Sequence, residues 1–94
     1  MLRADETARR VVDPRLVTFL DDDLSRGGVL SSTVQAFARA DLNLRATAEH
    51  LHVHPNTAQC RLRRIEERTG RNPRRVADLL DLLVAIAFRR TSVP

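Results

Sequence analysis

The sequence predicts an all-α protein of about five helices, three of which form a helix-turn-helix core. Two observations lead to this fold class. The aromatic residues are three phenylalanines, and Leu, Val and Ala dominate the apolar set, which favours helices over strands. In addition, apolar residues recur at three- and four-residue steps in several segments, and capping residues, prolines or glycines bound those segments.

Length and composition indicate one small cytoplasmic domain. A chain of 94 residues has room for a single core. We expect this domain to span residues 13–90, between a flexible tail at 1–12 and a short tail at 91–94. The start of the sequence is charged, unlike a secretory signal, and the longest apolar run, Leu82–Phe88, is too short to cross a bilayer. The lone Cys60 cannot form an internal disulfide, which fits a reducing cytosol.

A first helix is expected from Asp13, a capping residue that a first-turn proline follows, to about Ser25. The acidic run 21–23 within it suggests a cation site at first sight. Consecutive residues on a helix point in different directions, however, so their carboxylates cannot converge on one ion. We therefore interpret the run as a solvated acidic patch.

A second helix is expected after the glycine pair at 27–28. Ser32 and Gln35 have the spacing of a capping box, and an apolar stripe continues to about Ala40. This helix would support the following motif from behind.

The middle of the sequence is typical of two helices that a sharp turn joins. Asn43 is placed to cap the first of them. Pro55 disfavours the α conformation in the residue before it, so the chain must turn at His54. His54 then occupies the capping position of a second helix, 55–69, and Gly70 can adopt the left-handed conformation that ends it.

The outward face of helix 55–69 is polar and basic. Residues at helical spacing that should face the core are Ala58, Leu62, Ile65 and Thr69. Asn, Gln and Arg side chains make paired hydrogen bonds to base edges, so this helix is expected to lie in the major groove of double-stranded DNA. The expected base-reading face consists of Pro55, Asn56, Thr57, Gln59, Cys60, Arg63 and Arg64. Phosphate contacts are expected from Asn43, Arg45, His54 and Arg61.

Arginine is concentrated on and just after this helix. Residues 43–94 carry ten arginines against five acidic residues, whereas residues 1–42 carry six against seven. Seven of the arginines fall between Arg61 and Arg75. Arginine-rich faces are often only solvated surface, but their concentration at one helix favours a nucleic-acid partner.

Several segments of the motif 43–70 match a known pattern: Thr47-Ala48, Leu51 to His54, Asn56-Thr57, Arg61 to Glu67 and Thr69-Gly70. In these residues the chain resembles the C-terminal helix-turn-helix domain of PucR/CdaR-type bacterial transcriptional regulators. The resemblance implies a Fis-like DNA-binding fold that pairs as a dimer, and it extends more loosely from Pro14 to Arg90.

Two positions depart from that family. Cys60 stands where an aromatic residue is usual, and Pro55 stands where a varied or basic residue is usual. Both lie on or near the expected reading surface, so no base preference is carried over from the family. Regulators of this type carry a sensing domain ahead of the motif. The sequence leaves open whether the chain is the C-terminal part of such a regulator or a stand-alone protein.

A last helix is expected over about 74–90. All but two of the residues from 76 to 88 are apolar, and a helix that is apolar almost all round must be buried almost all round. The three-helix core can cover one stripe only. We therefore expect a homodimer through helix 74–90, and the competing explanation is that another domain of a longer protein covers it.

Other functions find less support in the residues. His50, His52 and His54 alternate through a turn, where their rings should diverge, and no cysteine or acidic residue completes a ligand set, so we expect no metal and no cofactor. Cys60 has no histidine or acidic residue one turn away on its own face, so we expect no enzyme. The main alternative is a helical dimerisation or protein-docking module that has lost DNA binding, because Pro55 and Cys60 reduce the polar reach of the reading face.

Overall fold

The computed structural model describes residues 13–92 and confirms the all-α prediction. This part of the chain contains five helices and no strand: α2 (Pro14–Ser25), α3 (Val29–Arg39), α4 (Leu44–Leu51), α5 (Pro55–Thr69) and α6 (Val76–Ser92). The tail predicted at 1–12 lies outside the described residues, as do residues 93–94. No helix between residues 13 and 92 combines the length and apolar character that crossing a bilayer requires.

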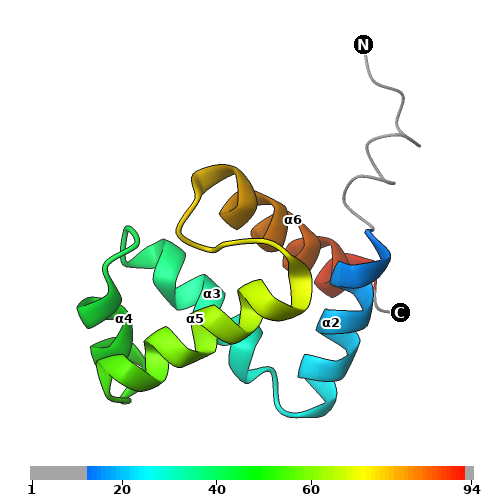
Figure 1. Ribbon diagram of the computed structural model, residues 1–94. Helices are drawn as coiled ribbons and strands as arrows, with labels where there is room; N and C mark the ends of the chain where they lie inside the picture. The colour runs from blue at the N-terminus through cyan, green and yellow to red at the C-terminus, as the bar shows by residue number, and fades with distance from the viewer. Residues whose placement is uncertain (1–12, 93–94) are drawn as a thin grey trace.

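Helix α3 lies at the centre of the fold, because it contacts each of the other four described helices. Among those helices, α4 packs only on α3 and α5, whereas α2 and α6 pack on each other and on α3. Figure 1 accordingly shows α4 at one end of the molecule and α2 with α6 at the other, with α5 crossing between them. This arrangement leaves one long side of α5 uncovered.

Apolar residues from four helices form one core. Its buried members are Leu16, Phe19, Leu20, Leu30, Val34, Phe37, Leu62, Ile65, Leu79, Leu82, Ala85 and Ile86. The stripe that the sequence predicted for the inner side of α5 is buried, including the fully enclosed Ala58 and Thr69. Burial of each of the larger apolar side chains contributes roughly 1.5–3 kcal/mol to the free energy of unfolding. It also determines which side of α5 faces solvent.

Three predicted helix caps are present. The capping side chains accept a hydrogen bond from a backbone N–H two or three residues further on: Asp13 at 2.9 Å, Asn43 at 2.9 Å and His54 at 3.0 Å. Gly70 ends α5 with a φ of 72°, the left-handed conformation predicted for it. Local sequence therefore determines both ends of the motif.

The predicted capping box at Ser32 and Gln35 is wrong. Helix α3 begins at Val29, so Ser32 lies inside its first turn, and no side chain of the preceding residue Gly28 is there to cap it. The cap comes instead from Asp23 of α2. Its Oδ1 accepts from the backbone N–H of Leu30 at 3.0 Å, and its Oδ2 accepts from Ser31.

The expectation that the acidic run 21–23 is a solvated patch is wrong for Asp23, whereas Asp21 and Asp22 are accessible to solvent. The Asp23 side chain is buried because it caps α3. Asp22 forms an ion pair with Arg68 of α5 at 2.8 Å, and Asp21 forms one with Arg89 of α6 at 2.9 Å. The three carboxylates do point in different directions, as expected, but each direction leads to a different neighbouring element.

The last helix begins at Val76 rather than at 74, and it continues to Ser92, two residues into the predicted C-terminal tail. Its start is delayed because Pro73 is fully buried in the preceding turn, where the Asn72 Oδ1 accepts from the backbone N–H of Arg74 at 2.9 Å. One face of α6 joins the core. The opposite face leaves Val76, Leu80 and Val84 exposed at 65%, 54% and 45%.

Two ion pairs of Arg71, in the segment after α5, connect it to the start of α2 and to α6. Arg71 donates from Nη2 to Asp13 at 3.0 Å and from Nε to Asp81 of α6 at 3.4 Å. The backbone N–H of Arg15 and then the Arg71 guanidinium hold the pKa of the Asp13 carboxyl below its ordinary value of 3.8, against the opposing effect of partial burial.

We expect Asp23→Ala to lower the free energy of unfolding by roughly 2 kcal/mol or more, because two backbone donors at the buried start of α3 lose a charged acceptor. Urea unfolding monitored by circular dichroism measures this loss. Ser32→Ala is the control and should change stability by less than about 0.5 kcal/mol. Equal losses in the two variants would contradict the assignment of the cap.

Asp13→Asn should flatten the acid dependence of stability. A carboxylate whose pKa is depressed in the folded state contributes stability above about pH 4, and that contribution disappears as the pH falls through the folded pKa. An asparagine side-chain oxygen still caps α2 but does not pair with Arg71. The variant should therefore be less stable than the unmodified protein at pH 7 and lose less stability between about pH 5 and pH 2. Urea unfolding at a series of pH values measures this, and identical profiles would contradict it.

Candidate nucleic-acid interface

The turn between α4 and α5 holds the two helices in a fixed relation. After Leu51 the chain passes through His52, whose φ of 58° is unusual for a residue with a side chain. The backbone N–H of Val53 then donates to the carbonyl of Ala48 at 3.0 Å, which closes the end of α4. His54 is extended and caps α5, as the proline after it requires.

Small residues let α4 and α5 approach closely. Ala48 of α4 and Ala58 of α5 are both buried, with exposed fractions of 1% and 0%. Thr47 is buried as well, and its hydroxyl donates back to the carbonyl of Asn43 at 2.7 Å, so it leaves no unpaired polar group at this contact. The buried side of α5 therefore faces α3 and α4, and its polar side faces outward.

The structure brings the predicted base-reading residues onto one exposed surface of α5. Six of them are exposed: Asn56, Thr57, Gln59, Cys60, Arg63 and Arg64. Pro55 is half-buried at the first position of the helix. Within residues 13–92, no hydrogen bond or ion pair occupies the side chains of Asn56, Gln59 or Arg63. Their donors and acceptors are thus available to a ligand.

The residues predicted to contact phosphates lie at the starts of α4 and α5. Asn43, Arg45 and His54 are exposed, and Arg61 is half-buried on the flank of α5. Capping occupies only Oδ1 of Asn43 and Nδ1 of His54. The Asn43 amide nitrogen and the His54 Nε2 remain as donors, and they stand where helix N-termini carry partial positive charge.

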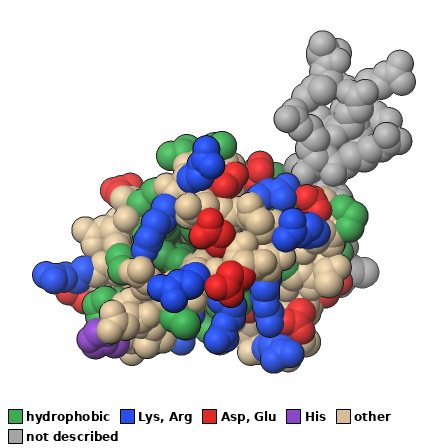
Figure 2. Space-filling model, viewed as in Figure 1, with side chains coloured by type: hydrophobic (Ala, Val, Ile, Leu, Met, Phe, Trp, Pro, Cys, Tyr) green, Lys and Arg blue, Asp and Glu red, His purple; other side chains and the backbone are tan. Residues whose placement is uncertain are grey.

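The arginines around α5 divide into two groups. Arg68 pairs with Asp22 of α2, and Arg71 pairs with Asp13 and with Asp81 of α6. Hydrogen bonds from Arg26 and Arg68 hold the pKa of the Asp22 carboxyl below its ordinary value. The others have no acidic partner among the described residues: Arg45, Arg61, Arg63, Arg64, Arg74 and Arg75. Figure 2 shows arginine side chains distributed over and beside α5, with some acidic side chains among them. The arginines without an ion pair thus gather mainly around α5, where Glu66 and Glu67 are also exposed.

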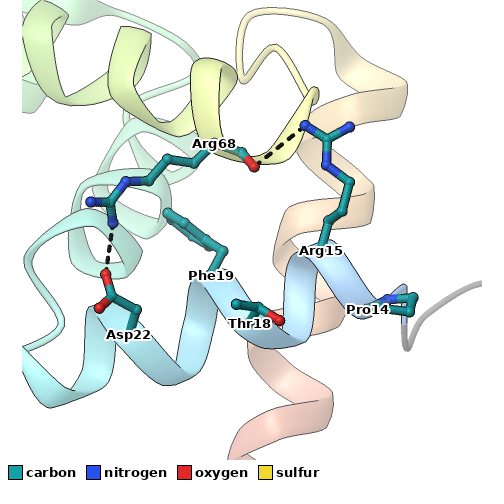
Figure 3. A pocket seen from close by; sticks show the side chains of 6 residues that line it. All are labelled: Pro14, Arg15, Thr18, Phe19, Asp22 and Arg68. Carbon is teal, nitrogen blue, oxygen red and sulfur yellow. Dashed lines mark hydrogen bonds and ion pairs between the residues drawn. The ribbon is translucent and has the colours of Figure 1, made fainter.

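A groove lies beside the C-terminal end of α5, where α2 passes it (Figure 3). Phe19 lines it, and its charged groups bind one another: Arg68 donates to Asp22 at 2.8 Å, and Arg15 reaches the carbonyl of Arg68 at 3.5 Å. These bonds hold the far end of α5 against α2. The groove is thus a structural junction, and its charged groups do not converge on an open site.

The three histidines of the turn occupy different positions. His50 lies exposed in the last turn of α4, His52 ends that helix, and His54 caps α5. Among residues 13–92 no group of three His, Cys, Asp or Glu side chains is placed to hold a metal ion.

Sequence reasoning left Arg74 and Arg75 out of the interface. Both are exposed in the turn after α5, and Arg74 lines a hollow together with Gln59 and Arg63. The signal that could have found them is the run of arginines that continues past Gly70. The sequence alone does not predict that the turn at residues 70–75 folds back beside α5.

Comparison with known proteins places this geometry in a family. The family described as the PucR C-terminal helix-turn-helix domain matches residues 30–88, which include α4, α5 and most of α3 and α6. No solved structure shows a significant match to the chain.

The curated relatives are longer proteins. The uncharacterized protein YsfB of Bacillus subtilis is 39% identical over 59 residues, which are 63% of this chain and 16% of the relative. The uncharacterized protein Rv2242 of Mycobacterium tuberculosis is 33% identical over 87 residues, which are 87% of this chain and 21% of the relative. The chain thus spans about a fifth or less of the relatives it matches. Because the family match covers more than half of the chain and includes the whole motif, this chain belongs to the family of PucR C-terminal helix-turn-helix domains.

Proposed function

We propose that the chain binds double-stranded DNA sequence-specifically, as the DNA-binding part of a transcriptional regulator, with α5 as recognition helix in the major groove. The observation that supports this most is the polar face of α5, which is exposed and unpaired while the opposite face is buried against α3 and α4. A helix of this diameter fits the major groove of B-DNA. Membership in a helix-turn-helix family supports the same function.

Base reading is assigned to the exposed side of α5 from Pro55 to Arg64. Asn56 and Gln59 suit adenine, and Arg63 and Arg64 suit guanine, because these pairs form two parallel hydrogen bonds. Thr57 and Cys60 lie on the same exposed surface, and Pro55 sets the direction in which the helix enters. A thiol in place of a larger side chain at Cys60 leaves space that a base or its methyl group can occupy.

Affinity is assigned to phosphate contacts from Asn43, Arg45, His54 and Arg61. The first three stand at the N-termini of α4 and α5, where backbone N–H groups and the helix dipole favour an anion. Phosphate contacts position a protein on the duplex without reading its sequence. This group therefore differs from the base-reading group in the effect expected from substitution.

The remaining length of the curated relatives leaves room for further domains. We propose that in a longer regulator a sensing domain precedes this one and that the protein works in the cytoplasm, where chromosomal DNA is accessible to it.

We propose in addition that two copies pair through α6. Val76, Leu80 and Val84 follow one another at four-residue steps and form an exposed apolar stripe. Burying apolar surface contributes about 25 cal/mol per Å², so covering this stripe symmetrically stabilises the pair. A two-fold dimer can present two recognition helices about 34 Å apart, which is one turn of DNA, and so read a palindrome.

The DNA proposal predicts steep salt dependence and a contrast between two variants. A sequence recovered from a random duplex pool should bind with an affinity that falls as salt rises, as expected for about five to eight phosphate contacts. Arg45→Ala should weaken binding to every duplex alike and lower the salt slope by about one, whereas Asn56→Ala should cost about 1–3 kcal/mol on the selected duplex only. Fluorescence anisotropy titrations on selected and scrambled duplexes measure both effects.

Two outcomes would count against this proposal. Equal losses on both duplexes for both variants would mean that a different face of α5 reads the bases. No binding to any duplex at low salt would reject DNA binding and favour the alternative, a helical dimerisation or docking module.

The dimer proposal predicts that Leu80→Asp yields a folded monomer, because Leu80 is 54% exposed and lies in the middle of the stripe. Leu83 is unsuitable for this test, since it packs against the core. Leu24→Asp is the matched control, since Leu24 on α2 is similarly exposed at 48%, and it should leave the dimer intact. Sedimentation equilibrium measures the mass. An unmodified chain that stays monomeric at high micromolar concentration would reject the dimer and indicate that another domain covers α6.

A further inference from the structure

The turn between α5 and α6 holds two arginines on a fixed backbone. Pro73 at its centre is fully buried, and the Asn72 Oδ1 accepts from the backbone N–H of Arg74 at 2.9 Å. The backbone N–H of Arg75 donates to the carbonyl of Asn72 at 3.0 Å. The N–H of Asn72 in turn donates to Oδ2 of Asp78 in the first turn of α6 at 3.0 Å. The buried proline, the hydrogen bonds within the turn and the bond to Asp78 thus fix the backbone, while the side chains of Arg74 and Arg75 are exposed.

The charges of these two arginines are not used within the described fold. Arg71, three residues before Arg74, pairs with both Asp13 and Asp81. Arg74 and Arg75 have no ion pair or side-chain hydrogen bond with any residue from 13 to 92. Arg71 therefore helps to hold the fold together, whereas Arg74 and Arg75 present their guanidinium groups to solvent.

Arg74 borders the recognition helix. A hollow of about 250 Å³ separates the turn from α5, and its lining consists of Gln59, Leu62, Arg63, Glu66, Asn72 and Arg74. Gln59 and Arg63 belong to the predicted base-reading face, so Arg74 stands beside that face. Arg63 lies about 10 Å along the helix axis from Asn56. A phosphate within reach of Arg74 is therefore a different one from those near the N-terminus of α5.

We propose that Arg74, with Arg75 beside it, contacts a backbone phosphate at the edge of the major groove that α5 enters. This inference rests on the proposed DNA binding and adds a contact site, on the turn after α5, to those at the starts of α4 and α5. Glu66 is the acidic member of the hollow's lining, and its carboxylate repels a phosphate that enters the hollow. The phosphate contact is accordingly assigned to the rim, where the guanidinium of Arg74 forms charge-assisted hydrogen bonds.

The test compares Arg74→Ala with Arg90→Ala, which removes one exposed arginine near the end of α6 and thus changes the net charge equally. Anisotropy titrations use a duplex recovered by selection and a scrambled duplex of equal length, over about 50–200 mM salt. Arg74→Ala should lower the salt slope by about one, so that the affinity lost over this range is about fourfold smaller than for the unmodified protein. It should weaken binding to both duplexes by the same factor. Arg90→Ala should leave the slope unchanged.

Two further variants sharpen the test. Arg74→Gln removes the charge but keeps a polar, though shorter, side chain, so it should reproduce the slope of Arg74→Ala. It replaces that variant if thermal melting shows that Arg74→Ala has a folding defect. Glu66→Gln removes the repelling carboxylate and should strengthen binding to both duplexes about twofold or more.

The outcomes distinguish the phosphate contact of Arg74 from the proposed DNA binding on which it rests. If Arg45→Ala lowers the slope but Arg74→Ala and Arg74→Gln behave as Arg90→Ala does, DNA binding stands and the contact at the turn is rejected. If Arg74→Ala weakens only the selected duplex, Arg74 reads a base and the phosphate assignment is wrong. If the unmodified protein binds neither duplex, both fail together.

Discussion

Packing of α3 against all four other described helices is the constraint on which the rest of the structure depends. The first turn of α3 is buried at Leu30 and Ser31, and the backbone N–H groups there need acceptors that water cannot supply. Asp23 meets this need from the preceding helix, and in doing so it fixes the angle between α2 and α3. The apolar sides of α4, α5 and α6 are then arranged around α3.

The position of α5 follows from this centre. Ala58, Leu62 and Ile65 bind it to the core, Ala48 allows α4 to come close, and the bond between Arg68 and Asp22 holds its far end against α2. A recognition helix has to be rigid, because its side chains must match base edges within the short range of hydrogen bonds. The contacts on the buried side supply this rigidity, and they leave the polar side without internal partners.

Arginine serves two purposes in the fold, and its acidic neighbours separate them. Arginines that reach α2 or α6 meet carboxylates and join helices, as Arg68 and Arg71 do. Arginines on the outer surface of α5 and in the turn after it meet none among the described residues. Asp22 of α2 thus pairs with the arginine at the far end of α5, and the arginines of the surface proposed to face DNA stay free to pair with phosphates.

The sequence by itself determined the helical class, the bounds of α4 and α5 and the buried side of α5. These features depend on local chemistry: Asn43 and His54 cap helices through their own neighbouring residues, Pro55 forces the turn before it, and apolar spacing defines one face. Only the tertiary structure decided what depends on contact between distant segments. The cap of α3 comes from a residue seven positions before its partner, so the local pattern at Ser32 was misleading. The start of α6, the ion pairs of Arg71 and the approach of Arg74 to Gln59 likewise follow from packing, because side chains remote in sequence meet only after the helices have assembled.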